Sequence, residues 1–394
     1  MNKETNKLIP EIRFPEFVNE GEWEKTTVSQ VAEYENGKAH EQDIIAQGKY
    51  VVVNSKFIST DGEVRKFSNS ANCLAKKNEI LMVLSDVPNG RAFAKCFYVG
   101  KDDFYTVNQR ICKITPVKAD GKLLLYLLNR NQFFLAFDDG VKQTNLRNED
   151  VLYCPIILPK NPNEQQKIAS CLSSLDEVIA AHNQKLEALK AHKKGLMQNL
   201  FPQEGETVPK YRFKEFVGDG EWVEKTLGEV CKMQAGKFVS ASGIKDNFME
   251  GFPCYGGNGL RGYTKSFTHS GNYSLIGRQG ALCGNVTFAD GTFHATEHAV
   301  VVTPENYIDK VWLYYVLVLL NLNQYATGQA QPGLSVSNLE KLELRVSKNP
   351  KEQQKIASCL SSLDDLITAQ VEKIEQLKLH KKGLMQGMFP KINE

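Results

Sequence analysis

Two long stretches of the chain space their apolar residues in alternating steps of four and three. Such steps average about 3.5 residues and predict helices that pack together as a coiled coil. Each stretch opens on Asn-Pro-x-Glu, which predicts an Asn N-cap with Pro at the first helical position, and each closes at a proline, Pro202 or Pro390. The predicted helix-packing positions are Ile168, Leu172, Leu175, Ile179, Leu186 and Leu189, and then Ile356, Leu360, Leu363, Ile367, Ile374 and Leu377.

Four polar residues interrupt this apolar seam: His182, Gln370, Lys193 and Lys381. Polar residues at seam positions commonly fix the register of a coiled coil, so a role in register is favoured over a ligand role. The two lysines belong to a repeated His-Lys-Lys-Gly run. That run has two open interpretations, contact with phosphate or a partner protein and a solvated helix end whose cations the helix dipole favours.

The two stretches are copies of each other. Residues 161–202 align with residues 349–390 at a constant offset of 188, and 30 of the 42 positions are identical. Residues 10–38 align with residues 209–237 at an offset of 199, and both segments carry RF-x-EFV-x-x-GEW and end in Gly-Lys. Such self-similarity predicts two half-molecules of one plan. The predicted parts are a lead-in with the first domain over 1–160, the first long helix over 161–202, a linker, lead-in and second domain over 203–348, and the second long helix over 349–394. The lead-ins are the aligned segments 10–38 and 209–237.

The stretches between the copies, 39–160 and 238–348, read as α+β domains because strand-like runs precede a helix-like run in each. Two-fold-like symmetry between the halves requires the long helices, each roughly 55 Å long, to run antiparallel. We therefore predict an α+β protein with two domains separated by an antiparallel coiled coil. The strands are predicted at 49–58, 79–84, 92–99, 110–114, 151–158, 273–277, 286–288, 299–302 and 342–346, and the helices near 122–137 and 309–322.

Polar loops in both domains combine glycine with Asn, Arg and Lys, as in the segment from Tyr255 to Lys265. Glycine permits close backbone approach, and these side chains can bind base edges or phosphate, although such loops are more often ordinary turns. The candidate DNA-binding residues are Asn54, Lys56, Arg65, Asn89, Arg91, Gln109 and Arg110 in the first domain and Tyr255, Asn258, Arg261, Tyr263, Lys265, Arg278 and Gln279 in the second.

Composition narrows the class of protein. The chain has 394 residues, 42% hydrophobic and 24% charged, which is typical of a globular protein. With 48 basic and 46 acidic residues, it cannot grip nucleic acid through net charge. Nine cysteines without a Cys-x-x-Cys pair fit neither a disulfide framework nor a zinc ribbon. With no secretory signal or membrane-length apolar run, we expect a soluble cytoplasmic protein with reduced thiols.

Catalytic motifs are missing from the sequence. There is no phosphate-binding GxxxxGK[ST] loop, no Gly-x-Gly loop after a strand and no Asn-Pro-Pro-Tyr-like run for adenine methylation. Asp61-x-Glu63-x-Arg65 is better explained as a turn than as a nuclease site, and His294-x-x-x-His298 as structural histidines than as metal ligands. We predict no catalytic residue and no metal site.

The full order of motifs resembles the specificity subunits of type I restriction-modification systems. The resemblance rests on three features that each occur twice: the lead-in, the domain that follows it, and a helical sequence that reads NPxEQQKIAxxLSSLD and continues to HKKGLMQ-x-x-FP. It implies that each domain reads one half of a split DNA site. The antiparallel helices would fix the spacer, and a rod of about 55 Å covers at most ~16 base pairs.

The resemblance also implies partners. The chain itself would be non-catalytic and bind no cofactor. It would recruit two methyltransferase subunits that use S-adenosylmethionine, and through them restriction endonuclease subunits that translocate on DNA with ATP and Mg²⁺. The alternatives are a related system with a fused methyltransferase-nuclease partner, an enzyme that acts alone, and a coiled-coil scaffold that binds only proteins.

Overall fold

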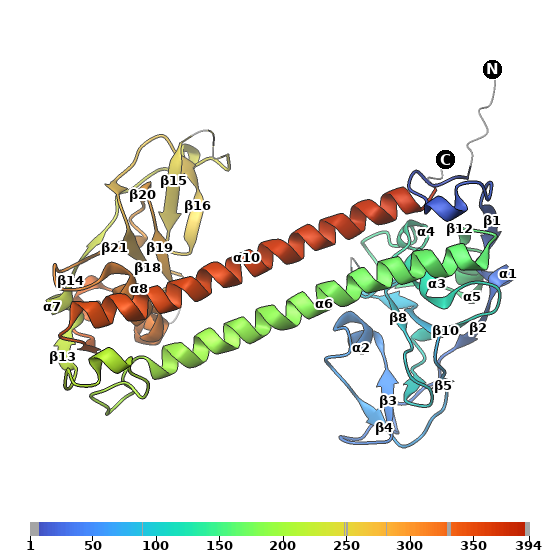
Figure 1. Cartoon of the computed structure of the whole chain (residues 1–394), viewed down its shortest axis with the longest axis horizontal. Helices are drawn as coiled ribbons and strands as arrows, with labels where there is room; N and C mark the ends of the chain where they lie inside the picture. The colour runs from blue at the N-terminus through green and yellow to red at the C-terminus, as the bar shows by residue number, and fades with distance from the viewer. Residues whose placement is uncertain are drawn as a thin grey trace. The chain divides into compact units, whose positions relative to one another are not determined.

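The computed structural model describes residues 8–88, 90–247, 249, 251–280, 282–328 and 332–390. The chain divides into two compact units (Figure 1). The first unit comprises the residues up to 182 together with those from 373 onward, and the second comprises residues 183–372. Each unit therefore holds one α+β domain, the first half of one long helix and the second half of the other.

The first unit contains short elements between its lead-in and its long helix. They are η1 (Pro15–Phe17), β1 (Glu24–Thr27), α1 (Val28–Val31), β2 (Ala32–Asn36), β3 (Tyr50–Val53), α2 (Ser55–Ser59), β4 (Phe67–Ser68), β5 (Leu74–Ala75), β6 (Ile80–Val83), β7 (Ser85–Asp86), β8 (Cys96–Tyr98), β9 (Tyr105–Val107), β10 (Ile111–Pro116), α3 (Gly121–Leu128), α4 (Gln132–Leu135), β11 (Thr144–Asn145), α5 (Asn148–Leu152) and β12 (Pro155–Leu158).

The second unit repeats this order of strands, with differences in the short helices between them. Its elements are η2 (Lys214–Phe216), β13 (Val223–Thr226), α7 (Leu227–Val230), β14 (Cys231–Ala235), η3 (Ala241–Gly243), β15 (Phe252–Gly256), β16 (Gly259–Thr264), β17 (His269–Ser270), β18 (Tyr273–Gly277), β19 (Val286–Ala289), β20 (Thr292–Ala295), β21 (Ala299–Pro304), α8 (Lys310–Leu319), η5 (Leu322–Tyr325), α9 (Val336–Leu339) and β22 (Glu343–Val346). The long helices are α6 (Pro162–Asn199) and α10 (Pro350–Met388).

The two domains share one topology. The first has a four-stranded sheet in the order β2-β10-β6-β8 and another in the order β4-β3-β9-β5. The second has β14-β21-β18-β19 and β16-β15-β20-β17, which are the same two orders element for element. In both, the second sheet contains one parallel pair, β3 with β9 or β15 with β20. The predicted α+β repeat is confirmed.

A buried sheet separates two cores in each domain. Successive residues of a strand point to opposite faces, so Ile80 packs with α3 and the long helices while Leu81 packs with the β3–β9 sheet. In the second domain Ile276 and Leu275 divide in the same way. Strands covered on both faces read as continuous apolar runs, which explains the Ile-Leu-Met-Val sequence of β6.

Several predicted elements have different bounds. The strand expected over 49–58 stops at Val53, because Asn54 caps α2 by accepting a hydrogen bond from the Phe57 N–H at 2.9 Å. The strand expected over 92–99 is confined to β8, since Ala94 has a left-handed φ of 54°. The helix expected over 122–137 is broken into α3 and α4 at Arg130, whose φ is 53°.

Two further predicted segments also differ from the structure. The strand predicted over 151–158 begins only at Pro155, because residues 148–152 form α5. The segment from Tyr255 to Lys265, expected to be a loop, is mostly a β-hairpin in which β15 and β16 pair antiparallel around Gly257 and Asn258. Period-two alternation is hidden there by four glycines and a proline.

The long helices pack antiparallel within each unit. In the first unit, Ile168 and Leu172 near the start of α6 share a core with Met388 at the end of α10. In the second unit, Met197 near the end of α6 shares a core with Ile356 and Leu360 near the start of α10. Of the twelve predicted packing residues, six are buried and the others half-buried. The buried ones are Ile168, Leu172, Leu186, Ile356, Leu360 and Ile374.

The seam lysines bind the facing helix. Lys381 lies 2.5 Å from Asp176, and Lys193 lies 2.5 Å from Asp364. A tyrosine of the adjoining domain completes each pair, since the Tyr126 hydroxyl donates to Asp176 at 2.6 Å and the Tyr315 hydroxyl to Asp364 at 2.7 Å. These contacts support the register role of Lys193 and Lys381.

A buried carboxylate joins the lead-in to the long helix in both units. Glu164, the glutamate of the first Asn-Pro-x-Glu pattern, accepts hydrogen bonds from Arg13 Nε at 2.7 Å and from the Trp23 indole at 3.2 Å. The hydrogen bond to Glu164 raises the pKa of Arg13. The N-cap itself is Asn161, whose side-chain oxygen accepts from the Asn163 N–H at 2.9 Å. Arg13 and Trp23 of the lead-in thus bind the start of α6.

The second unit repeats the contact with Glu352, Arg212 and Trp222. Arg212 Nε donates to Glu352 at 2.6 Å, and the Trp222 indole donates to the same carboxylate at 3.2 Å. The neighbouring glutamine works beside it: Gln353 Oε1 accepts from the Asp309 N–H at 2.8 Å, at the start of α8. At the start of α10, Glu352 and Gln353 therefore each have a hydrogen-bond partner from an earlier part of the chain.

We expect Glu352→Gln to destabilise the second unit by about 3–5 kcal/mol, because it leaves the Arg212 charge buried without its partner. Glu352 is 1% exposed and Arg212 is 9% exposed. Hydrogen exchange measured by mass spectrometry should speed up in residues 209–226 and stay unchanged in residues 10–27. The matched control is Glu215→Gln, which breaks an exposed pair with Lys355 and should cost less than about 1 kcal/mol. Equal effects of the two variants would contradict this assignment.

Candidate nucleic-acid interface

Three separated segments of each domain meet at one edge between its two sheets. We call residues 54–56, 84–86 and 108–110 the first loop cluster, and residues 256–258, 278–280 and 296–298 the second loop cluster. Backbone bonds hold them: the Leu84 N–H donates to Arg110 O at 3.0 Å, and the Arg278 N–H donates to His298 O at 3.0 Å. The two clusters are built on one frame.

Further backbone hydrogen bonds show which residues of the two clusters correspond. The Asn108 N–H donates to Val53 O at 3.0 Å, and the Thr296 N–H donates to Tyr255 O at 2.9 Å. A fourth segment lies against each cluster, because the N–H of Leu146 donates to Leu84 O and that of Leu334 donates to Arg278 O, each at 2.9 Å. Gln109 and Arg110 consequently occupy the places that Glu297 and His298 occupy in the second domain.

The glycine of the repeated Gly-Lys pair allows this frame to form. A Cβ on Gly37 would lie 2.1 Å from the backbone oxygen of Asn108, and one on Gly236 would lie 2.2 Å from that of Ala295. No side chain fits such an approach to backbone. The lead-in strand therefore passes directly beside the segment that carries residues 108–110 or 296–298, which explains why both lead-ins end in glycine.

The structure gathers some of the candidate residues of the first domain. Lys56, Gln109 and Arg110 are exposed at the first loop cluster. Asn54 is there as well, but its side-chain oxygen is engaged in capping α2. Arg65 and Arg91 are exposed outside the cluster, and Arg65 Nε donates to Gly62 O at 2.8 Å. Asn89 lies outside the described residues. A DNA contact stays a prediction for each of them.

The second domain gathers Asn258, Arg278 and Gln279, with Gln279 bridged to Gly333. Gly257 sits between them, since its Cβ position is 3.2 Å from Gln279 O and 3.3 Å from His298 O. Tyr255 lies one residue before the end of β15 and packs edge-on against Phe293 with a centroid distance of 5.6 Å. Of the other three candidates, Arg261 and Tyr263 lie within the hairpin strand β16, and Lys265 follows it directly.

Sequence reasoning missed Glu297 and His298. It treated His294 and His298 together as structural histidines, and this holds for His294, which is buried and contacts Ser266 at 3.2 Å and Lys237 O at 3.1 Å. The His298 side chain is 40% exposed and contacts Glu297 at 3.2 Å. An alignment of the five-residue runs that begin at the last residue of β9 and of β20, VNQRI with ATEHA, carries the signal that would have identified the pair.

Within the described ranges, no three His, Cys, Asp or Glu side chains gather as a metal site. Asp61, from the nuclease-like pattern, sits in a turn and pairs with Lys95 at 2.8 Å. Burial raises the pKa of Cys154 and Cys231 to about 12, so these thiols stay protonated at neutral pH. Across the same ranges, no helix has the length and apolar character to cross a bilayer.

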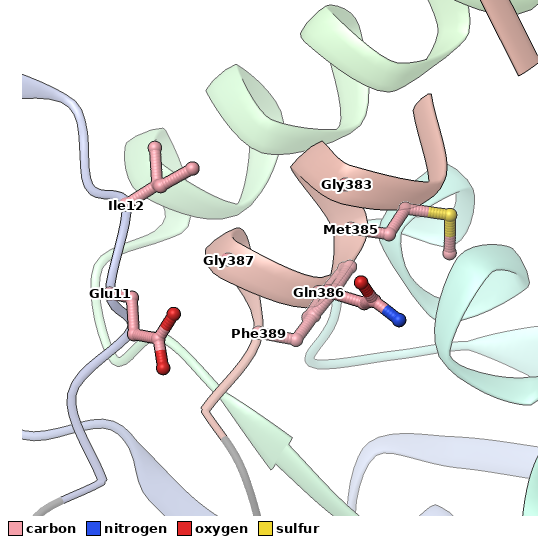
Figure 2. Close-up of a pocket in the computed structure, with 7 residues that line it drawn as sticks. All are labelled: Glu11, Ile12, Gly383, Met385, Gln386, Gly387 and Phe389. Carbon is pink, nitrogen blue, oxygen red and sulfur yellow. The ribbon is translucent and has the colours of Figure 1, made fainter. Parts of the chain in front are cut away.

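A hollow of about 520 Å³ lies where the end of α10 meets the lead-in of the first unit (Figure 2). The Ile12 N–H donates to Gly387 O at 2.8 Å, and Phe389 packs edge-on against Trp23 at 6.2 Å. The second unit makes the same junction within its continuous chain, because the Tyr211 N–H donates to Asn199 O at 2.8 Å. This hollow belongs to the junction between helix and lead-in, away from the loop clusters.

Comparison with known proteins gives the family. The model of the type I restriction modification DNA specificity domain matches residues 20–191 and 219–379, which is more than half of the chain. The chain belongs to this family. Each match takes in one α+β domain and most of one long helix, so the specificity family accounts for both halves of the repeat. The family expected from the sequence motifs is confirmed.

Individual relatives agree. The EcoprrI specificity subunit of Escherichia coli is 46% identical over 168 residues, which are 42% of this chain and 41% of that subunit. The MjaVIII specificity subunit of Methanocaldococcus jannaschii is 26% identical over 420 residues, covering 97% of this chain and 95% of the relative. A solved type I S subunit from M. genitalium has the same fold, with a TM-score of 0.70, 19% identity, and coverage of 98% of this chain and all of the other.

We expect Gly236→Ala to destabilise the second domain by about 1–3 kcal/mol, because the new methyl group meets the backbone oxygen of Ala295. Urea unfolding measures the change, and hydrogen exchange should show residues 295–299 loosening first. The control is Gly195→Ala in α6, where a Cβ meets nothing within 4 Å and helix propensity should add about 0.5–1 kcal/mol of stability. A Gly236→Ala protein as stable as the parent would show that the close approach is not required.

Proposed function

We propose that the chain supplies the DNA sequence specificity of a type I restriction-modification complex, with each domain reading one half of a bipartite site. The observation that carries this proposal is the pair of loop clusters, which share one backbone frame and differ in their side chains. Equivalent frames present residues to DNA in the same manner. Different side chains at equivalent places read different base pairs.

In this proposal the long helices set the distance between the half-sites and dock the partner subunits. Support comes from their repeated sequence: the same Lys–Asp–Tyr contact recurs in both units, so one type of partner finds the same helical surface twice. The partners are two methyltransferase subunits and, through them, the restriction endonuclease subunits. S-adenosylmethionine, ATP and Mg²⁺ belong to those partners, and this chain is a non-catalytic subunit.

Near-neutral net charge fits a subunit that works inside such an assembly. With 48 basic against 46 acidic residues, the chain has little bulk attraction for phosphate. Phosphate contacts dominate the affinity of proteins for DNA, whereas base contacts supply specificity. The chain would therefore contribute base readout, while the methyltransferase subunits share the hold on the DNA backbone.

The test is an exchange of residues 39–160 for the matching domain of another specificity subunit. The parent and the exchanged chain are each co-expressed with the modification subunit, and methylated adenines are mapped across the genome. We expect two half-sites with a fixed spacer for the parent, and a change in one half alone after the exchange. A motif that changes in both halves, or methylation that needs no specificity chain, would contradict the proposal. Methyl transfer by the purified chain alone would contradict its non-catalytic role.

A further inference from the structure

We propose that Glu297 and His298 form the base-reading pair of the second domain, and that the Glu297 carboxylate binds an exocyclic amino group of a base. The proposal rests on the function proposed above and adds two specificity residues to it. The amino group is the N4 group of cytosine or the N6 group of adenine, which share the same donor chemistry in the major groove.

Position in the frame is the first argument. The backbone bonds from Leu84 to Arg110 and from Arg278 to His298 place the two dipeptides at the same point of the same fold. Gln109 and Arg110 are both exposed in the first domain. Residues at corresponding places of two reading domains have the same access to DNA. The second domain therefore presents Glu297 and His298 where the first presents a glutamine and an arginine.

The state of the carboxylate is the second argument. One carboxylate oxygen of Glu297 contacts His298 Nε2 at 3.2 Å, while Oε2 is buried and accepts no hydrogen bond from the described residues. A buried polar atom without a partner costs folding free energy and calls for an explanation. The side chain is 35% exposed, so a change of side-chain rotamer can move Oε2 out of its buried position. The unused acceptor is thus available to a donor arriving from outside.

The geometry around the pair is the third argument. The neighbouring loops approach so closely that a Cβ on Gly277 would lie 1.9 Å from Gly257 O. This contact holds the turn of the β15–β16 hairpin beside the segment that carries Glu297. The Arg278 backbone is bonded to His298, so a cationic side chain starts next to the carboxylate and offsets its repulsion of DNA phosphates.

Chemistry then separates the two clusters. An arginine offers only donors and suits the O6 and N7 acceptors of guanine, while a glutamine offers both a donor and an acceptor. An ionised glutamate offers only acceptors, so it rejects the guanine edge and requires a donor. One frame carrying Gln-Arg in one domain and Glu-His in the other would select different base pairs at corresponding places of the two half-sites.

The experiment uses the full chain with Glu297→Gln, co-expressed with the modification subunit, and methylated-adenine mapping as the readout. We expect the first half-site and the spacer to stay as in the parent. Discrimination should fall about tenfold or more at one base pair of the second half-site. The parental base at that pair, cytosine or adenine, identifies which amino group the carboxylate binds. The control is Glu343→Gln on β22, which should leave the whole motif unchanged.

A second variant, Glu297→Asp, separates loss of the acceptor from loss of the fold. It keeps the carboxylate, so the parental base should remain preferred, with slower methylation. An unchanged motif in Glu297→Gln would overturn the proposal, as would the same altered motif in both variants or a change in the first half-site. A parent chain that specifies no bipartite motif would instead refute the proposed function, so the two failures are distinguishable.

Discussion

One buried carboxylate holds each half of the molecule together. The side chain of Glu164 or Glu352 is 1% exposed, and it is bound by an arginine and a tryptophan of the lead-in, which lie 130–151 residues earlier in the chain. An ionised group in such a place is tolerated only when it is fully paired, so the lead-in, the helix start and the domain between them must assemble together. The domain is closed at its base by this contact, and its strands are held against the helix pair.

That closure leaves the opposite edge of each domain free to vary. The backbone bonds at the loop clusters recur at corresponding positions, whereas the side chains they carry differ: Gln109 and Arg110 against Glu297 and His298. A fold with a constant base and a variable edge suits a protein that must recognise two unlike DNA sequences while offering partners the same helical surface twice. The contact that stabilises each domain and the residues proposed to read DNA therefore lie in different parts of one domain.

Much of this architecture could be predicted from the sequence because it is written as periodicity and repetition. The 3.5-residue seam predicted both helices and their packing residues, and the offset copies predicted two domains of one fold. Contacts between distant residues were beyond such reasoning. Glu164 was part of a local helix-start pattern, which carries no information about its partner Arg13, 151 residues away in the chain.

The composition of the loop clusters was predicted only in part for a related reason. Polar, glycine-containing loops marked one side of each cluster, and the exposed Gln109, Arg110, Asn258 and Gln279 do lie there. Glu297 and His298 were overlooked because an acidic residue does not suggest DNA binding, and because His294, four residues before His298, is buried in the core. Only the shared backbone frame equates them with Gln109 and Arg110.

The central claim is that the two loop clusters lie on different halves of one DNA site. The most direct measurement places a photo-crosslinking amino acid at position 109 or, in a second protein, at position 297. Each full chain is assembled with its modification subunits on a duplex that contains the mapped site. The account predicts crosslinks to bases of one half-site from position 109 and of the other half-site from position 297. Crosslinks from both positions to the same half-site, or from neither to any base, would contradict it.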